Sequence, residues 1–170
     1  MYHRSVKTLV LVRHAKSSWK DASLPDRDRP LNQRGKRDAP EMGRRLAKRG
    51  GAPDLIVSSP ASRALATARM IAAGIDYPVD RILEDERIYE AEPADLLAVI
   101  RSLDDDLDRV FLVGHNPGLT DLVHELSDTG VGDLPTCAVV ELRVSVDSWG
   151  DVARDRVRRT WFDTPKGARA

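Results

Sequence analysis

Short apolar runs alternate with amphipathic segments along this chain, and the alternation predicts strands and helices in turn. Residues 8–13, 55–58 and 109–113 are aliphatic or β-branched runs without polar alternation, which is typical of central strands covered on both faces. Residues 140–146 alternate between apolar and polar side chains, and we expect a strand with one solvated face, beside which residues 156–162 pair. The polar positions on that solvated face are Glu141, Arg143 and Ser145.

Apolar residues at helical spacing predict helices between these strands. Ser59 followed by Pro60 is an N-cap signal for a helix that ends at Gly74. Asn116 and Pro117 repeat this signal, and another helix follows Pro93.

An earlier helix opens near Asn32, and Pro40 either kinks it or moves its start, so its boundary stays open. Its basic run, Arg44, Arg45, Lys48 and Arg49, is typical of a solvated helix face.

This βαβ order predicts an α/β fold, a three-layer α/β/α sandwich with a mostly parallel central sheet. The chain has 170 residues, 41% of them hydrophobic, which is enough to bury one core and support a pocket. We therefore expect one domain over residues 1–170, with a core at about 7–162 and a flexible tail at 163–170.

Charge and composition exclude several classes of function. Lys and Arg (27) balance Asp and Glu (27), so no global field favours nucleic acid or an acidic membrane, and we expect neither as a partner. The apolar run 9–12 is shorter than a signal-peptide core of roughly 7 to 15 residues, and we interpret the protein as cytoplasmic. Cys137 is the only cysteine, which excludes an intrachain disulfide.

Candidate chemistry gathers at the ends of the predicted strands. Arg13 and His14 follow the first strand, His115 follows the strand at 109–113, and Arg63 lies near a helix N-terminus, where backbone N–H groups favour anions. Guanidinium groups match phosphate oxygens in geometry and charge. The sequence therefore predicts a pocket for a phosphoryl dianion.

Several motifs resemble those of the histidine phosphatase (phosphoglycerate mutase-like) superfamily. LVRHAKSSW is similar to its Arg-His-Gly signature, SSPASRALATA to its middle arginine motif and VGHNPG to its second histidine motif. Together with RPLNQRG and IYEAEP, in this order, they resemble the SixA-like phosphohistidine phosphatase branch over roughly residues 8 to 125. Ala15 stands where the broad superfamily usually has glycine, and this branch accepts alanine.

The resemblance implies roles for five residues. His14 would attack phosphorus and carry the phosphoryl group; Arg13, Arg63 and His115 would hold its oxygens; and Glu90 would protonate the leaving group. Glu86 and Glu92 are nearby alternatives for this acid. Since the arginines would neutralise the developing charge, we expect no metal and no cofactor.

Three further residues are candidate substrate contacts. Ser17 and Lys20 lie close behind His14, although Lys20 stands where mutase-like relatives commonly place a phosphate-binding asparagine. Arg29 belongs to RPLNQRG, which serves either as a loop leading to the Asn32 cap or as a substrate contact.

Spacing bears on the substrate. Arg63 and Glu90 are 27 positions apart, and Glu90 and His115 are 25 apart, so no long insertion is available to form a lid. An open pocket suits phosphohistidine on a signalling phosphoprotein, which the resemblance also implies. The alternatives are a phosphomonoesterase for small phosphorylated molecules and a noncatalytic phosphate-binding module.

Overall fold

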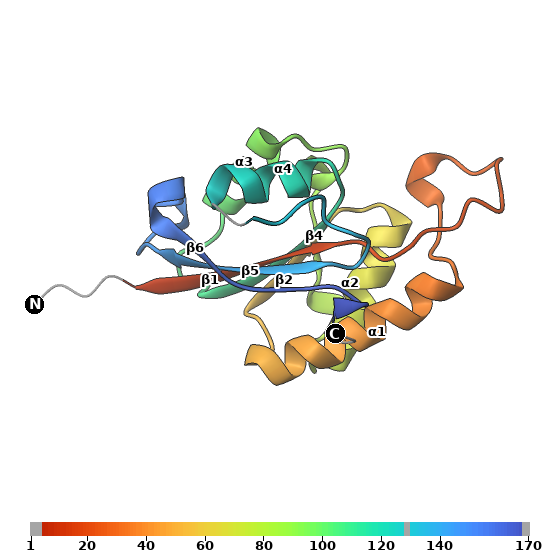
Figure 1. The fold of residues 1–170 in the computed structure, drawn as a ribbon, viewed down its shortest axis with the longest axis horizontal. Coiled ribbons are helices and arrows are strands. Elements are labelled where there is room, and N and C mark those ends of the chain that lie inside the picture. The colour runs from red at the N-terminus through yellow and green to blue at the C-terminus, as the bar shows by residue number, and fades with distance from the viewer. Residues whose placement is uncertain (1–4, 128–129, 168–170) are drawn as a thin grey trace, which may run out of the picture.

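The computed structural model describes residues 5–127 and 130–167, and these form a mixed sheet between two layers of helices (Figure 1). The sheet order is β3-β2-β4-β1-β5-β6. The strands are β1 (Val6–Arg13), β2 (Leu55–Ser58), β3 (Leu83–Glu84), β4 (Arg109–Gly114), β5 (Val139–Ser145) and β6 (Val157–Asp163). The α-helices are α1 (Gln33–Gly50), α2 (Ser62–Gly74), α3 (Pro93–Arg101) and α4 (Gly118–Leu126).

The sheet is parallel over its first four strands and antiparallel where the last two join it. β1 pairs in parallel with β4, β4 with β2 and β2 with β3. β5 pairs antiparallel with β1, and β6 antiparallel with β5. The predicted α/β fold with a mostly parallel sheet is confirmed, and so is the late pairing of the last two strands.

The helices cover the sheet on both faces. α1 and α2 pack together on one face and α3 and α4 on the other (Figure 1). One core cluster lies under α3 and α4 and includes Leu11, Leu112 and Leu122; a second lies under α1 and α2 and includes Val10 and Phe111. Neighbouring residues of one strand thus enter opposite cores, as expected for strands buried on both faces.

The helix starts differ in part from those predicted. α1 begins at Gln33, its Asn32 cap accepts a hydrogen bond from the Gly35 amide (2.9 Å), and the helix continues through Pro40. α2 begins at Ser62 rather than directly after Ser59, and α4 begins at Gly118. The hydroxyl of Ser59, expected to cap α2, lies near the pocket described below.

One prediction on the last strands is wrong in detail. Glu141, expected on a solvated face, is 3% exposed, because α1 covers this end of β5. Burial opposes ionisation of this carboxyl, but hydrogen bonds from Thr160 and Arg49 outweigh it and lower the pKa of Glu141.

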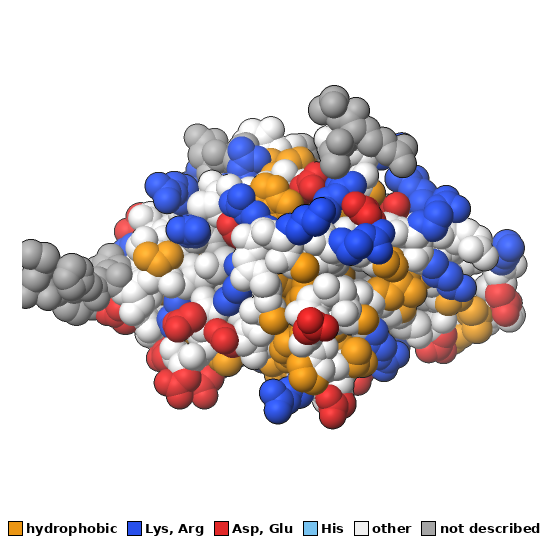
Figure 2. All heavy atoms as spheres, turned by 90° about the horizontal axis from the view of Figure 1, so that it is seen from below, with side chains coloured by type: hydrophobic (Ala, Val, Ile, Leu, Met, Phe, Trp, Pro, Cys, Tyr) orange, Lys and Arg blue, Asp and Glu red, His pale blue; other side chains and the backbone are white. Residues whose placement is uncertain are grey.

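The first residues of the expected tail at 163–170 are held in place. Asp163 is the last residue of β6, and Arg45 donates hydrogen bonds to the carbonyls of Thr164 and Pro165. Arg45 is thus half-buried rather than part of a solvated face, whereas Arg44, Lys48 and Arg49 are exposed. On the α1 and α2 side of the molecule, basic and acidic side chains surround an apolar area (Figure 2). Residues 168–170 lie outside the described residues.

Candidate active site

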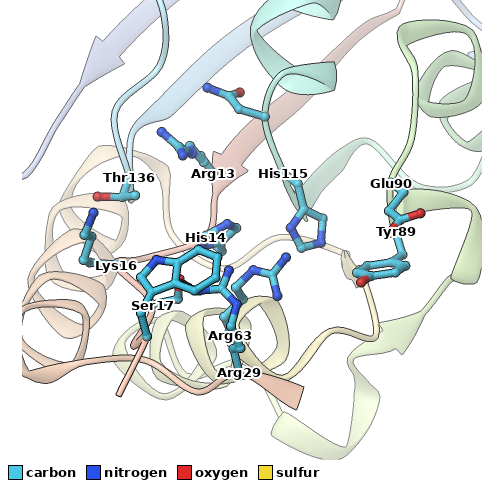
Figure 3. Close-up of a pocket in the computed structure, with 12 residues that line it drawn as sticks. Arg13, His14, Lys16, Ser17, Arg29, Arg63, Tyr89, Glu90, His115 and Thr136 are labelled. Carbon is cyan, nitrogen blue, oxygen red and sulfur yellow. Dashed lines mark hydrogen bonds between the residues drawn. The ribbon is translucent and has the colours of Figure 1, made fainter. Parts of the chain in front are cut away.

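A pocket of about 280 Å³ opens where β1, β2 and β4 end and their following loops diverge. This is the position at which parallel α/β sheets bind ligands. Its lining residues are Arg13, His14, Lys16, Ser17, Trp19, Arg29, Arg63, Tyr89, Glu90, His115, Asn116 and Thr136. Figure 3 shows His14 and His115 at its centre, with Lys16 and Thr136 on one side and Tyr89 and Glu90 on the other.

The backbone of His14 is fixed from three sides. Its amide donates to the carbonyl of Gly114 at 3.0 Å, and its carbonyl accepts from the amide of Cys137 at 3.1 Å. The next amide, that of Ala15, donates to the Thr67 hydroxyl at 2.9 Å, which ties this turn to α2. The nucleophile predicted from the sequence therefore sits on backbone that the sheet and a helix hold in place.

The ring of His14 has a defined tautomer. Its Nδ1 lies 2.7 Å from the carbonyl oxygen of Ala15. A carbonyl only accepts hydrogen bonds, so Nδ1 carries the proton and the neutral ring keeps its lone pair on Nε2. Nε2 is therefore the atom able to attack an electrophile.

Both pocket histidines are neutral at pH 7. Burial lowers the pKa of His14 to about 4, and the charges of Arg63 and Arg13 add to the lowering. Burial, then the neighbouring His14 and Arg63, lower the pKa of His115 to about 3. The neighbouring guanidinium charges lower both pKa values further, but burial is the principal cause. The ring centroids lie 5.1 Å apart.

Ser59 orients the second histidine. Nε2 of His115 lies 2.7 Å from the Ser59 hydroxyl, which also accepts a hydrogen bond from the amide of Ala61. The Ser59 hydroxyl is thus held by the start of α2 and contacts the ring of His115 through Nε2. The helix cap predicted at Ser59 is in fact a support for His115.

Asp26 links the arginine of α2 to the opposite rim of the pocket. Arg63 donates to the backbone carbonyl of Asp26 (2.7 Å) and to its carboxylate (3.0 Å), and Tyr89 donates its hydroxyl to the same carboxylate (2.7 Å). The hydrogen bond from Tyr89, followed by those from Arg63 and Arg29, lowers the pKa of Asp26 to about 2, although desolvation opposes this. The same contact raises the pKa of Tyr89 to about 12. Asp26 therefore stays ionised and Tyr89 protonated.

Arg29 lies within the pocket, so RPLNQRG both lines the site and caps a helix. Its guanidinium donates to the Asp26 carboxylate (3.2 Å) and to the Ser17 hydroxyl (3.0 Å). It also stacks over Trp19, 3.5 Å from the ring centroid. Lys20, the other candidate contact in this region, is exposed and does not line the pocket.

Three buried nitrogens in the pocket residues have no hydrogen-bond partner within the described part of the chain. They are Nε of Arg13, Nε of Arg63 and Nδ1 of His115. Buried donors without an acceptor are costly and rare in folded proteins. All three side chains line one pocket, whose several arginine and histidine nitrogens suit an acceptor-rich, anionic ligand.

Of the three candidate acids, only Glu90 lines the pocket. Glu86 forms an ion pair with Arg27, and Glu92 precedes α3 as its N-cap. Glu90 is exposed, with a φ of 53°. Its loop lies against the start of α4, where a Cβ on Gly118 would stand 2.3 Å from the carbonyl oxygen of Ala91. Glycine at this position therefore lets the Glu90 loop approach the turn that carries His115.

Sequence reasoning missed several residues that line the pocket or contact its lining side chains. Asp26, Tyr89, Lys16, Trp19 and Thr136 belong to loops or to motifs in which another residue drew attention. Tyr89 stands directly before Glu90, and Asp26 three residues before Arg29, so the motifs already contained or adjoined them. Only the folded chain shows that the two side chains meet.

The sequence profile of the histidine phosphatase superfamily (branch 1) matches residues 9–96. The chain belongs to the histidine phosphatase superfamily. Within this superfamily it is 32% identical, over 165 residues, to an uncharacterized protein of Mycobacterium tuberculosis. The alignment covers 91% of this chain and 100% of that protein.

Solved structures place this histidine phosphatase near the SixA proteins. The putative phosphohistidine phosphatase SixA of Nakamurella multipartitia has a TM-score of 0.82 at 25% identity, over 96% of this chain and 99% of that one. The putative SixA of Agrobacterium tumefaciens has a TM-score of 0.77 at 28% identity, over 94% and 98%. The SixA-like resemblance and the phosphoglycerate mutase-like fold are confirmed, and the protein is a phosphatase of the histidine phosphatase superfamily.

Among the described residues, no helix is both long and apolar enough to span a membrane.

Proposed function

We propose that this phosphatase hydrolyses phosphohistidine on a protein, through a phosphoryl group carried transiently by His14. The observation that carries the proposal is the convergence on one pocket of His14, which has a free Nε2 lone pair, with the side chains of Arg13, Arg63 and His115. This combination supplies a nucleophile and a cationic receptor for phosphoryl oxygens in one place.

The reaction follows in two displacements. Nε2 of His14 attacks phosphorus, the bond from phosphorus to the leaving group breaks, and Glu90 gives that group a proton. Water, deprotonated by the carboxylate that results, then attacks phosphorus and breaks its bond to Nε2, releasing phosphate. Arg13, Arg63 and His115 hold the equatorial oxygens in both steps, and no metal ion is required for this charge neutralisation.

The open pocket supports a protein substrate. Glu90 is exposed, and Trp19 at the rim is 72% exposed, so the mouth is accessible to a side chain presented on another protein. The two similar SixA structures are those of putative phosphohistidine phosphatases, which supports the same substrate class for this chain.

The alternative is a phosphomonoesterase for small phosphorylated molecules. Glu90, exposed at the pocket rim, supports it because a carboxyl there can protonate an alkoxide leaving group. An alkoxide is a poor leaving group that needs its proton in the transition state. Imidazole, with a pKa near 6.5 as its conjugate acid, leaves more easily. The two functions therefore place different demands on Glu90.

Glu90→Gln separates them. We expect kcat/KM on a phosphohistidine peptide to fall by less than about tenfold, and kcat/KM on an alkyl phosphate by about 100-fold or more. Both are measured by phosphate release, with Glu92→Gln as the matched control because Glu92 lies outside the pocket. Equal losses on both substrates, with the alkyl ester preferred by the wild type, would reject the phosphohistidine assignment.

A noncatalytic phosphate-binding module, the other function considered from the sequence, disagrees with the phosphatase class of this chain. It predicts binding of phosphate without turnover of any phosphorylated compound. A screen over phosphohistidine, phosphoester and phosphoanhydride substrates tests it, since hydrolysis of any one that is lost in His14→Ala excludes a purely binding role.

A further inference from the structure

A basic groove leads away from the pocket past Trp19. The pocket shares Lys16, Ser17 and Trp19 with an adjoining hollow of about 400 Å³, which in turn shares Ser18, Lys20 and Asn32 with a third hollow of about 340 Å³. We call the two outer hollows the basic groove; segments 16–20 and 30–36 form it. Because neighbouring hollows share lining residues, the groove adjoins the pocket along segment 16–20.

All the charged residues that line this groove are basic. Its walls carry Lys16, Lys20, Arg34 and Lys36, and none of the residues that line it is Asp or Glu. Arg34 is paired with Asp38 at 3.5 Å, whereas Lys16, Lys20 and Lys36 form no ion pair within the described part of the chain. In a protein with a formal net charge of zero, this local excess of positive charge favours an anionic partner.

The groove is rigid before any ligand arrives. The amide of Ser18 donates to the carbonyl of Pro30 (2.8 Å), and the amide of Asn32 donates to the carbonyl of Lys16 (2.9 Å). A Cβ on Gly35 would stand 2.3 Å from that same Lys16 oxygen, so the first turn of α1 packs directly on segment 16–18. Its basic side chains therefore project from a fixed backbone, which lowers the entropy lost on binding.

Trp19 stands between the pocket and the groove. Arg29 covers one face of the ring, and the side chain remains 72% exposed. An exposed tryptophan held by a buried arginine is typical of a contact residue in a protein interface. It lines both the pocket and the first groove hollow, so a bound chain that fills the pocket also passes over this ring.

We propose that the basic groove binds an acidic segment of the substrate protein next to its phosphorylated residue. The inference rests on the proposed protein substrate and adds to it a selection by charge, with Lys16, Lys20 and Lys36 meeting carboxylates and Trp19 packing on the chain between them. The groove lies beyond the pocket that holds the phosphoryl group, so it recognises what flanks that group. The N-terminal end of the α1 dipole adds to the attraction for anions.

The test uses two synthetic peptides of equal length, each with one central phosphohistidine, flanked by glutamates in one and lysines in the other. The ratio of their kcat/KM values within one variant cancels any change at the reacting centre. For the wild type we expect the acidic peptide to be preferred by about tenfold or more at low salt, with the ratio falling as salt screens the groove. In Lys20→Glu/Lys36→Glu the ratio should fall to one or below.

The matched control is Lys48→Glu/Lys166→Glu, which makes the same change of charge at exposed lysines that do not line pocket or groove. A ratio that falls equally in both double variants would reduce the effect to net charge and overturn the proposal. So would a wild type that prefers neither peptide.

Phosphoserine peptides with the same two flanking sequences test the groove hypothesis separately from the phosphohistidine assignment. Their dissociation constants are measured by fluorescence anisotropy and need no turnover. Tighter binding of the acidic peptide, lost in Lys20→Glu/Lys36→Glu alone, supports the groove even if no phosphohistidine is hydrolysed. Equal binding of both peptides overturns the groove even if phosphohistidine turnover is rapid.

Discussion

At the scale of single residues, the site depends on the charge state of two histidines. The Ala15 carbonyl fixes the proton of His14 on Nδ1, and burial together with the nearby guanidinium groups keeps both His14 and His115 neutral. A neutral His14 keeps a lone pair for attack, and the arginines supply the positive charge that the phosphoryl group needs. Nucleophile and charge are thus divided between different side chains.

The low pKa values of His14 and His115 can be tested by titration. By NMR in the folded protein we expect the midpoint of His14 near pH 4 and that of His115 near pH 3, both rising to about 6.5 in urea. Because both folded pKa values lie below the unfolded value, the unfolded chain binds more protons in between. The free energy of unfolding should therefore fall as pH decreases from about 6.5 towards 4. His14→Gln and His115→Gln assign the signals, and a midpoint above 6 for His14 would contradict the assigned environment.

At the scale of elements, close backbone approaches align the parts of the site. α1 meets segment 16–18 at Gly35, and the start of α4 meets the Glu90 loop at Gly118. In each case a Cβ would stand 2.3 Å from a backbone carbonyl oxygen, which cannot move aside as a flexible side chain can. These glycines set how near the surrounding loops come to the histidines.

Gly35→Ala tests this packing. Alanine favours a helix over glycine by about 1 kcal/mol, but forcing the contact with Lys16 apart costs about 1–3 kcal/mol, so we expect a net loss of about 1 kcal/mol in the free energy of unfolding. Urea unfolding measures it. The matched control is Gly132→Ala, where an added Cβ meets nothing within 4 Å and the change should stay within about 0.5 kcal/mol. Stabilisation of Gly35→Ala would show that the contact yields freely.

Strands and site residues at strand ends were predictable, because an apolar run fixes where a strand ends and a parallel sheet brings such ends together. This holds for His14 and His115. The environment of Glu141 was not predictable, since its burial depends on where α1 ends over β5. Neither was Asp26, because its contacts with Arg63 and Tyr89 join residues 37 and 63 positions away.

At the scale of the whole molecule, the candidate catalytic residues and the basic groove lie at the same end of the sheet, where the parallel strands end. The ends of β1 and β4 present the histidines, α2 adds Arg63, and the start of α1 borders the basic groove. The antiparallel strands β5 and β6 extend the sheet on the side opposite to β3, and the loop before β5 adds Thr136 to the pocket lining. The fold therefore places a phosphoryl-binding pocket next to the basic groove, which can bind the surface of a substrate protein.

The central claim is that His14 carries the phosphoryl group, and trapping this intermediate tests it most directly. The protein, in EDTA because no metal is expected to take part, is mixed with a ³²P-labelled phosphohistidine peptide and quenched in alkaline detergent within the first turnover. We predict label on the protein that is stable in alkali and lost in acid, present in the control His124→Ala and absent in His14→Ala. Undiminished hydrolysis by His14→Ala, or label that persists in this variant, would contradict the account.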